Sequence, residues 1–347
     1  MPRAALYCIL LFLLDTGCNG SPAEPASLKN RRADFSATPN LSLSLVPIDT
    51  LFIRDAPNRI TRGIKTDRAG NLLFAAFTKI IRFDGKTFTE IPKPTEITEF
   101  NAYDAAEDRK GNLWIADMLN GIYRFDGKEF IHFTGAEGLV HNRTMHLTED
   151  QAGNIWIGTM SGVSRYNGDT FHNSTTAEGL CFDDVSVITE DYAGRLWFGT
   201  REYACVYDPA TAEFTRLTDS QGKPFFNIWE IVQDSQNNVW LGGENGLWRY
   251  DGSDFTRIAE YFVNGIAEDR DGNIFTISPD GSLNIYDRKS LAEGIYLPRE
   301  IHHSSSMPFA LTKDRDGKMW VGTGNGVFSY DGEKVRYFRD SAGIYQK

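Results

Sequence analysis

A short motif recurs along this chain at nearly constant spacing. In its clearest copy, residues 149–159 read Glu-Asp-Gln-Ala-Gly-Asn-Ile-Trp-Ile-Gly-Thr, so that an acidic turn leads into an apolar segment with a Trp. The copies begin 41, 42, 41, 43, 35 and 45 residues apart, at Asp67, Asp108, Asp150, Asp191, Asp234, Asp269 and Asp314. A period near forty residues that is built from short strands is typical of propeller blades.

Each copy also predicts its own strands and turns. Residues 185–190 alternate and are rich in β-branched side chains, which is typical of a strand. An Asp-x-x-Gly turn then leads to a buried second strand, residues 162–166 exemplify a third, and an Asp-Gly or Asn-Gly turn leads to a fourth, as at 128–133. We therefore predict an all-β fold, a seven-bladed β-propeller of four-stranded antiparallel blades. The tryptophans of the second strands should then form the core between blades; they are Trp114, Trp156, Trp197, Trp240 and Trp320.

The first eighteen residues predict a signal peptide. Arg3 precedes an apolar stretch, residues 4–14, that is too short to cross a bilayer as a mature helix. The following Thr16-Gly17-Cys18 resembles a bacterial lipoprotein cleavage site, although Asp15 departs from that pattern. We predict a lipoprotein-type signal peptide at 1–18 with lipidation of Cys18, and an ordinary secretory signal is the alternative.

Two further regions follow the signal. Residues 19–47 are poor in apolar side chains and contain Pro and Ser, which predicts a flexible tether. The propeller is expected at 48–347. Residues 51–54 could add a strand that joins the two ends of the ring, although the last repeat provides four strands of its own.

The net charge limits the choice of partners. The chain carries a formal charge of −11 and has no basic stripe, which argues against a nucleic-acid partner. Acidity of this kind keeps an exported protein soluble. Together with the signal it predicts a location in the cell envelope, anchored to a bacterial membrane through an N-terminal lipid.

Two cysteines remain once the signal is removed. Cys181 and Cys205 fall within the same repeat, near one face of the predicted blade. In an oxidising compartment they could form a disulfide, and two buried free thiols are the alternative.

A binding site is predicted on the loops that enter the first strands and on those that join the second and third strands. Loops on a rigid scaffold commonly carry function, and these combine aromatic, amide, carboxylate and Arg side chains. Packing is the alternative for Trp229, and an ordinary surface position is the alternative for His141 and Arg143. The predicted ligand is a polar small molecule, a glycan or a peptide, or a protein partner in the envelope. The candidate ligand-binding residues are Asp117, Asn120, His141, Arg143, Arg201, Glu202, Trp229, Glu244, Asn245 and His302.

Two segments suggest a metal site, and neither is predicted to be one. His302 and His303 are adjacent, so on an extended segment their side chains should point in opposite directions. Residues 269–273 start like a calcium loop, yet they align with the turn of every other repeat and lack the distal Glu. We therefore expect neither a metal nor a cofactor.

Over residues 60–340 the repeated pattern, which ends in Gly-Leu-x-Arg-Tyr-Asp-Gly, resembles the two-component regulator propeller repeat. That repeat builds extracytoplasmic sensor regions of bacterial hybrid sensor kinases and also occurs in stand-alone secreted proteins. The resemblance implies a non-catalytic module for ligand binding, sensing or protein interaction.

The chain is similar, more distantly, to the propellers of virginiamycin B lyases. The alternative function is therefore a lyase that acts at the central top face. Such a reaction needs a general base and a group that stabilises the developing charge. The inner strands offer only His146 as the base, without the paired His and Glu that the lyase family would lead us to expect.

Overall fold

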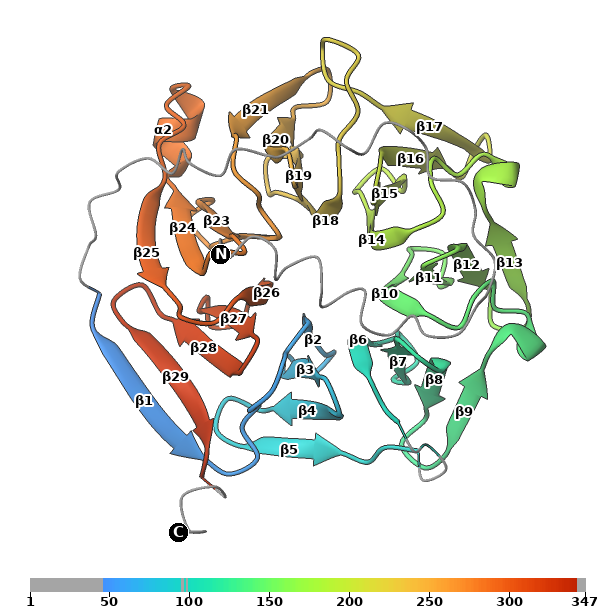
Figure 1. Ribbon diagram of the computed structural model, residues 1–347, viewed down its shortest axis with the longest axis horizontal. Coiled ribbons are helices and arrows are strands. Elements are labelled where there is room, and N and C mark those ends of the chain that lie inside the picture. Colours follow the sequence, from blue (N-terminus) through green and yellow to red (C-terminus); the bar gives the residue numbers. More distant parts are fainter. Residues whose placement is uncertain (1–45, 95–96, 98, 342–347) are drawn as a thin grey trace, which may run out of the picture. The chain divides into compact units, whose positions relative to one another are not determined.

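The computed structural model describes residues 46–94, 97 and 99–341, which form seven β-sheets around a common axis (Figure 1). The predicted seven-bladed β-propeller is therefore confirmed. The predicted signal peptide, Cys18 and most of the predicted tether lie outside the described residues.

Each blade is an antiparallel sheet whose strands run in chain order from the axis to the rim. Blade 1 contains β2 (Gly63–Thr66), β3 (Leu72–Ala76), β4 (Lys79–Phe83) and β5 (Phe88–Ile91); blade 2 contains β6 (Ala102–Glu107), β7 (Leu113–Asp117), β8 (Gly121–Phe125) and β9 (Phe130–Phe133); blade 3 contains β10 (Thr144–Glu149), β11 (Ile155–Thr159), β12 (Gly162–Tyr166) and β13 (Phe171–Ser174); blade 4 contains β14 (Val185–Glu190), β15 (Leu196–Thr200), β16 (Ala204–Asp208) and β17 (Glu213–Leu217). Blade 5 contains β18 (Ile228–Gln233), β19 (Val239–Gly243), β20 (Gly246–Tyr250) and β21 (Phe255–Ala259); blade 6 contains β22 (Gly265–Glu268), β23 (Ile274–Ile277), β24 (Ser282–Tyr286) and β25 (Arg299–His303); blade 7 contains β26 (Pro308–Lys313), β27 (Met319–Thr323), β28 (Gly326–Tyr330) and β29 (Val335–Asp340).

The strands predicted from the sequence agree closely with these bounds. The first and third example strands, residues 185–190 and 162–166, coincide with β14 and β12. The fourth, predicted at 128–133, begins later, at Phe130, because the Asp126 carboxylate accepts hydrogen bonds from the backbone N–H groups of Lys128 and Glu129 and holds them in the turn.

The ring closes through a strand that precedes blade 1. Strand β1 (Ile48–Ile53) runs parallel to β29 and forms a fifth strand at the outer edge of blade 7. Leu51 lies opposite Phe338 in this pairing. The segment proposed for closure is thus a strand, and it adds to the four strands of the last repeat.

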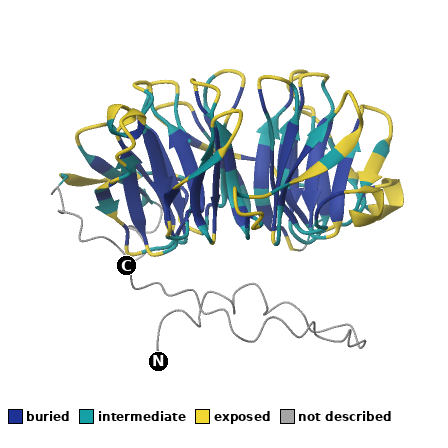
Figure 2. Cartoon of the chain, turned by 90° about the horizontal axis from the view of Figure 1, so that it is seen from above, coloured by how far each residue is buried: buried dark blue, intermediate teal, exposed yellow. Residues whose placement is uncertain are grey.

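The core lies between neighbouring blades, as the buried inner strands in Figure 2 show. All five residues of β19 are buried, and the Trp240 indole N–H donates to the Asp234 carboxylate over 2.8 Å. The same bond recurs in blades 2, 3, 4 and 7. The repeated Asp therefore fixes the turn and satisfies the indole of a buried Trp. In blade 6, Asp269 accepts backbone N–H bonds from Asp271 and Asn273, which confirms a turn there.

In the described residues, helical structure is confined to short connections. Two 3-10 helices, η2 (Gly135–Glu137) and η3 (Thr176–Glu178), follow blades 2 and 3, and helix α2 (Arg288–Ala292) separates β24 from β25. Within the part of the chain that the structure describes, none of the helices is long and apolar enough to cross a membrane.

Candidate functional site

The innermost strands carry a β-bulge at the same place in five blades. A bulge re-aims the side chain of its extra residue and is frequent next to functional sites. The register shifts place one residue per blade in this bulge; these residues are Tyr103, Met145, Ser186, Trp229 and Phe309. Arg62 and Asn264 occupy the matching positions in blades 1 and 6, one residue before the ladders begin at Gly63 and Gly265. We call these seven residues the axial ring.

Four members of the axial ring keep their side chains partly exposed and suit ligand contact. They are one guanidinium and three aromatic rings, from Arg62, Tyr103, Trp229 and Phe309. The other three have structural roles. Met145 is buried, Ser186 donates to the carbonyl of Ile228, and Asn264 donates to the carbonyl of Pro308.

Arg62 and Tyr103 form a contact between blades 1 and 2. The Arg62 guanidinium carbon lies 5.1 Å from the centre of the Tyr103 ring and 5.7 Å from that of Phe77. Its Nη1 donates to Asn101 Oδ1 over 3.0 Å. Burial lowers the pKa of Arg62 from its ordinary value, and the neighbouring Tyr103 opposes this shift.

Charged groups of blades 1 and 4 influence the pKa of the Tyr103 hydroxyl. Burial raises its pKa, Arg62 lowers it, and Asp184 raises it from blade 4. Arg201, also from blade 4, lowers it slightly. Tyr103 is therefore close enough to the blade 4 loops for their charges to act on its hydroxyl, although blade 3 lies between the two blades.

A second group of ionisable side chains lies on the innermost strands, shortly after the axial-ring residues in the sequence. We call Lys65, Asp104, His146 and Glu230 the axial cluster. Lys65 Nζ lies 2.5 Å from Asp104 Oδ2, and the same oxygen accepts the backbone N–H of Leu147 over 2.9 Å. His146 Nε2 is 3.9 Å from that oxygen.

Burial moves two pKa values of the axial cluster in opposite directions. It lowers the pKa of His146 to about 3, and nearby Lys65 lowers it further while Asp104 opposes the shift. It raises the pKa of Glu230 to about 8, against the influence of Lys65. At neutral pH both His146 and Glu230 are therefore predominantly uncharged, because burial penalises the charged form of each group.

The axial cluster also has a structural role. Each innermost strand is the edge of its sheet, so part of its backbone has no partner strand. Side chains from the preceding blade satisfy these groups. Asp104 accepts from the N–H of Leu147, and His146 Nδ1 accepts from the N–H of Ile188 over 3.3 Å. These bonds connect blades 2, 3 and 4 near the axis.

Three of the predicted site residues converge on one loop residue, Asn227. Its backbone N–H donates to the carbonyl of Arg201 over 2.8 Å. Its Oδ1 accepts the indole N–H of Trp229 over 3.0 Å, and its Nδ2 donates to Glu244 over 3.4 Å. Asn227 has a φ of 48°, in the left-handed region that Asn tolerates better than most residues. Arg201 also forms an ion pair with Asp184 at 2.7 Å.

Other predicted residues near this group mainly shape its loops. Glu202 follows Arg201 in the loop and is half-buried. Asn245 accepts from the backbone of Phe226 over 3.4 Å and donates to the carbonyl of Pro224 over 3.3 Å.

The blade 2 candidates are part of the loop framework. Asp117 is fully buried and accepts hydrogen bonds from the backbone N–H groups of Leu119 and Asn120. It also accepts the N–H of Asn101. Asn120 donates to the carbonyl of Glu99 over 2.7 Å. Both side chains are therefore already engaged in holding the loop.

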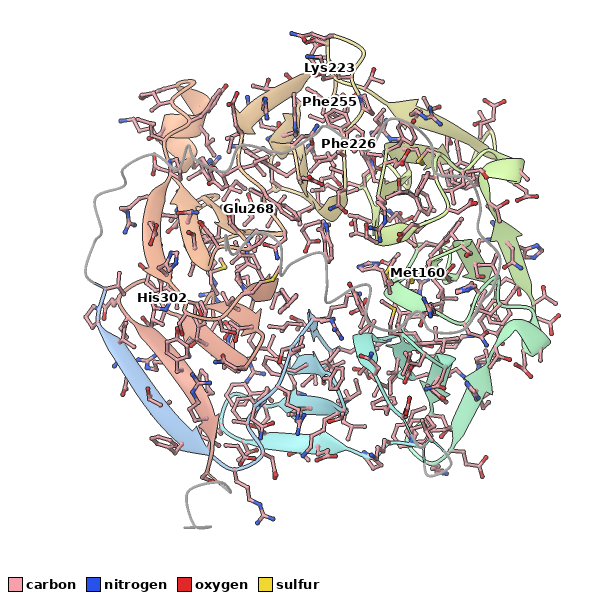
Figure 3. The ribbon with its side chains drawn as sticks, in the orientation of Figure 1. Met160, Lys223, Phe226, Phe255, Glu268 and His302 are labelled. Carbon is pink, nitrogen blue, oxygen red and sulfur yellow. A yellow bond between two sulfur atoms is a disulfide. The ribbon has the colours of Figure 1, made fainter. Side chains whose placement is uncertain are left out.

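His141 and Arg143 lie together on the loop that enters blade 3. His141 Nδ1 accepts the backbone N–H of Arg143 over 3.1 Å, and burial followed by Arg143 lowers the pKa of this imidazole. The Arg143 carbonyl accepts from the backbone of Met160, which Figure 3 shows at the inner end of blade 3. Both predicted residues are half-buried loop residues.

His302 does not lie on a loop that enters a blade. It belongs to β25, the outermost strand of blade 6, and Figure 3 shows it towards the rim. Its Nε2 lies 2.7 Å from the Tyr337 hydroxyl, and its ring packs edge-on against Phe328. Burial lowers its pKa. The structure therefore separates His302 from the residues near the axis.

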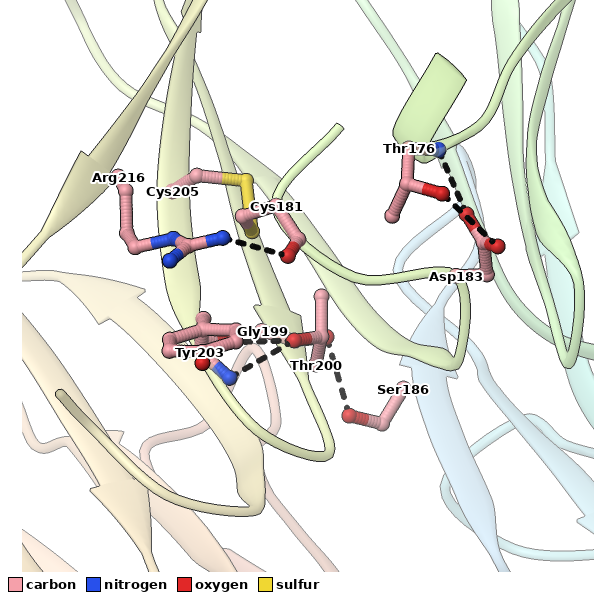
Figure 4. The surroundings of a disulfide bond; sticks show 9 residues. All are labelled: Thr176, Cys181, Asp183, Ser186, Gly199, Thr200, Tyr203, Cys205 and Arg216. Atoms are coloured by element: carbon pink, nitrogen blue, oxygen red, sulfur yellow. Dashed lines mark hydrogen bonds between the residues drawn. A yellow bond between two sulfur atoms is a disulfide. The ribbon is translucent and has the colours of Figure 1, made fainter. Parts of the chain in front are cut away.

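A disulfide holds the loop that carries Asp184. Cys181 and Cys205 are bonded, with their Cα atoms 6.1 Å apart (Figure 4). The same loop is held by Arg216, which donates to the Cys181 carbonyl and lies over the Tyr203 ring at 3.8 Å. The disulfide thus steadies the segment that leads to the ion pair of Asp184.

A shallow hollow of about 380 Å³ lies on the loop side between blades 7 and 1. Its lining includes Asn58, Arg59, Ile60, Phe77 and Gly324. Phe77 has a φ of 53°, an unusual backbone conformation for a bulky residue that often accompanies a functional or closely constrained site. Phe77 also contacts Arg62, so the hollow adjoins the axial ring.

Of the axial cluster, only His146 was identified from the sequence, and Arg62 and Tyr103 were not. A single repeat shows no unusual motif at these positions. Only an alignment of all seven innermost strands shows that one position varies between aromatic, charged and small residues, and that the position after it carries Asp104, His146 and Glu230 in three of the blades. The exposure and the bulge at that position then require the structure.

Comparison with known proteins supports the repeat type. The family model described as two component regulator propeller matches residues 138–161, 179–202 and 303–325. The resemblance to this repeat is thus confirmed. No curated protein matches the chain.

Several solved structures share the fold at low sequence identity. The extracellular domain of a putative hybrid two component system from B. thetaiotaomicron is 17% identical with a TM-score of 0.65, and the match covers 78% of this chain and 39% of that chain. Catalytically inactive virginiamycin B lyase from Staphylococcus aureus, solved with quinupristin, is 14% identical with a TM-score of 0.64, covering 80% of this chain and 96% of that one. PorZ, a surface component of the type-IX secretion system of Porphyromonas gingivalis, is 13% identical with a TM-score of 0.57, covering 77% and 51%.

At these identities the likeness concerns the fold alone. The chain also spans less than half the length of the two component system domain. The repeat match and the fold agree with each other, however. This chain is a seven-bladed β-propeller, and three of its segments match the two component regulator propeller model.

Proposed function

We propose that the chain is a non-catalytic, extracytoplasmic ligand-binding module whose ligand meets the loop side of the axial ring. The observation that carries this proposal is the axial ring itself, where four blades present a partly exposed guanidinium or aromatic ring at the same level of their innermost strands. Aromatic faces with a few fixed polar groups are typical of ligand sites. Polar small molecules, such as glycans or peptides, match this mixture.

The comparisons support the location and the role. Extracellular domains of putative two component systems share the fold of this chain, and three segments of the chain match the two component regulator propeller model. A sensing role outside the cytoplasm follows by analogy. Lipidation of Cys18 would attach such a module to a membrane, and a protein partner in the envelope would receive its signal.

A thermal-shift screen with glycans and short peptides tests the proposal. We expect a ligand-induced rise in the melting temperature of the wild type that is lost in the double variant Arg201→Ala/Trp229→Ala, because both residues bond to Asn227, Arg201 through its backbone carbonyl and Trp229 through its indole N–H, so their side chains start from the same group of loops. The apo melting temperature should change little, since both side chains are partly exposed.

The control removes an Arg and an aromatic residue from turns between first and second strands. Arg68→Ala/Tyr192→Ala should retain the ligand-induced shift, because both residues are exposed in those turns. If both double variants keep the shift, the proposed site is wrong. A large drop in the apo melting temperature of Arg201→Ala/Trp229→Ala would instead assign Trp229 to the core.

A lyase is the second candidate, favoured by one observation. The axial cluster brings the imidazole of His146 within 3.9 Å of a carboxylate, in a fold that matches virginiamycin B lyase over most of its length. The lyase is less well supported than the binding module, because a general base works best with a pKa near the operating pH and the pKa of His146 is lowered to about 3. Incubation with quinupristin and chromatography would detect turnover, and turnover that is lost in His146→Gln would favour the lyase over the binding module.

A further inference from the structure

Among the described residues of the axial ring and the axial cluster, one charged group has no ion-pair partner of opposite sign. Lys65 pairs with Asp104, and Arg201 pairs with Asp184. His146 and Glu230 are predominantly uncharged at neutral pH. The remaining charge is that of Arg62.

Arg62 is surrounded by groups that orient it without neutralising it. It donates to the neutral amide of Asn101, and its guanidinium lies near the rings of Phe77 and Tyr103. Among residues 46–94, 97 and 99–341, no carboxylate forms an ion pair with it. A guanidinium that is half-buried loses hydration, and a carboxylate partner restores the lost interaction through two parallel hydrogen bonds.

We propose that Arg62 binds a carboxylate group of the ligand, and that Tyr103 and Phe77 contact the part of the ligand next to it. This inference rests on the proposed ligand-binding function and specifies the ligand class. A saccharide acid and the C-terminus of a peptide both provide such a group. Arg suits this task better than Lys, because its planar fork matches the two oxygens of a carboxylate.

Space for the ligand is present beside Arg62. The hollow between blades 7 and 1 shares Phe77 with the Arg62 contact and has a volume of about 380 Å³. Exposed Arg59 in the same lining adds a second positive charge. The acidic loop residues Glu202 and Glu244 belong to blades 4 and 5, so that side of the axis favours uncharged or positive parts of a ligand.

Binding of matched probes tests the inference. Trigalacturonate is compared with its methyl ester, and the tripeptide Ala-Ala-Tyr with a free C-terminus is compared with its amide. We expect the wild type to bind at least one free acid and to bind its neutral counterpart at least about tenfold more weakly, as a hydrogen-bonded charge pair predicts. Whichever free acid binds, the saccharide or the peptide, identifies the source of the carboxylate.

Variants connect the preference to Arg62. In Arg62→Gln the affinity for the free acid should fall about 10- to 100-fold while that for the neutral probe stays constant. Arg62→Lys should recover only part of the loss, because it retains the charge without the fork. Arg54→Gln changes the net charge equally at a position outside the site and should leave both affinities unchanged.

Two results would overturn the inference. One is that neither free acid binds, and the other is that Arg62→Gln binds the free acid as tightly as the wild type. A neutral or cationic probe could instead bind to the wild type and to Arg62→Gln but not to Arg201→Ala/Trp229→Ala. That result would support the proposed function and reject the inference that the ligand carries a carboxylate. If neither Arg62→Gln nor Arg201→Ala/Trp229→Ala loses binding of any probe, both the carboxylate inference and the proposed function are rejected.

Discussion

The aspartate that marks each repeat has a second role at the level of single residues. In blade 5, Asp234 accepts from its own turn and from the indole of Trp240, which is 1% exposed. A buried carboxylate oxygen that loses such a donor has no water to replace it. The spacing of the motif, with Trp six residues after Asp, is therefore a requirement of this bond.

We predict that Trp240→Phe lowers the free energy of unfolding by about 1–3 kcal/mol beyond the cost of the smaller ring, because the buried Asp234 Oδ2 loses one of its two donors and keeps Asn238 Nδ2 alone. Urea denaturation gives this value. Trp248→Phe is the matched control, since Trp248 lies in the same blade and its indole N–H has no hydrogen-bond partner among the described residues. Equal losses in the two variants would show that the bond contributes nothing.

A further prediction concerns pH and the axial cluster. The pKa of Glu230 is raised to about 8 from an ordinary 4.5, so the folded protein keeps a proton that the unfolded chain releases. Stability from this group is complete below pH 4.5 and is lost as the pH rises through about 8, with a slope of at most about 1.4 kcal/mol per pH unit.

Glu230→Gln should remove this slope, and urea midpoints measured across the pH range would show it. His146 provides the opposite sign as an internal control. Its pKa is lowered to about 3 from 6.5, so its contribution is present above pH 6.5 and is lost as the pH falls. That acid-side loss should persist in Glu230→Gln, and an unchanged alkaline slope would assign the effect to another group.

At the level of elements, blades 3 and 4 offer a natural comparison. Their loops enter in the same way, through a capping box at Thr134 in one and Thr175 in the other. The position of Cys205 corresponds to Ser164 in blade 3, where the Ser164 hydroxyl accepts the backbone N–H of Val140 over 3.0 Å. A covalent bond in blade 4 therefore replaces a hydrogen bond in blade 3.

We predict that Cys181→Ala/Cys205→Ser lowers the free energy of unfolding by about 3 kcal/mol, because the bond closes a loop of 24 residues in the unfolded chain. Urea denaturation measures the loss. A reducing agent should produce the same loss in the wild type and none in the variant. A wild type that is insensitive to reduction would contradict a stabilising disulfide.

The elements also show how far sequence reasoning reached. Strand positions followed from the repeat, because each strand is bounded by its own turn. His302 was expected on a loop and lies in β25, since helix α2 and the segment after it lengthen the connection within blade 6 and delay the fourth strand. Trp229 was expected near the ligand, whereas Arg62 and Tyr103 were not, because their prominence depends on contacts between blades.

At the level of the whole molecule, closure of the ring was the open question. The repeats predicted seven complete blades and could not say what joins the last to the first. Strand β1 provides the answer through a parallel pairing that carries no turn signal. Its side chains are largely exposed, as Ile48 at 61% and Phe52 at 58% illustrate, so its hydrogen bonds to β29 provide most of its attachment.

We predict that a chain starting at Arg54 still folds, because blade 7 keeps its own four strands, but is less stable by about 1–3 kcal/mol through the loss of several ladder hydrogen bonds. Urea denaturation compares it with a chain that starts at Val46 and retains β1. Failure of the shorter chain to fold would mean that β1 is required for the ring to form. Equal stability of the two would mean that β1 does not contribute to closure.

The parallel orientation of β1 and β29 also determines how the molecule resists mechanical load. A force that pulls residue 46 away from residue 341 draws the two strands along each other in opposite directions, since their paired ends point the same way. The hydrogen bonds lie across the strands, so they are loaded in shear and must break together instead of unzipping one after another. A propeller held by a stretched leader would therefore keep its ring intact under tension.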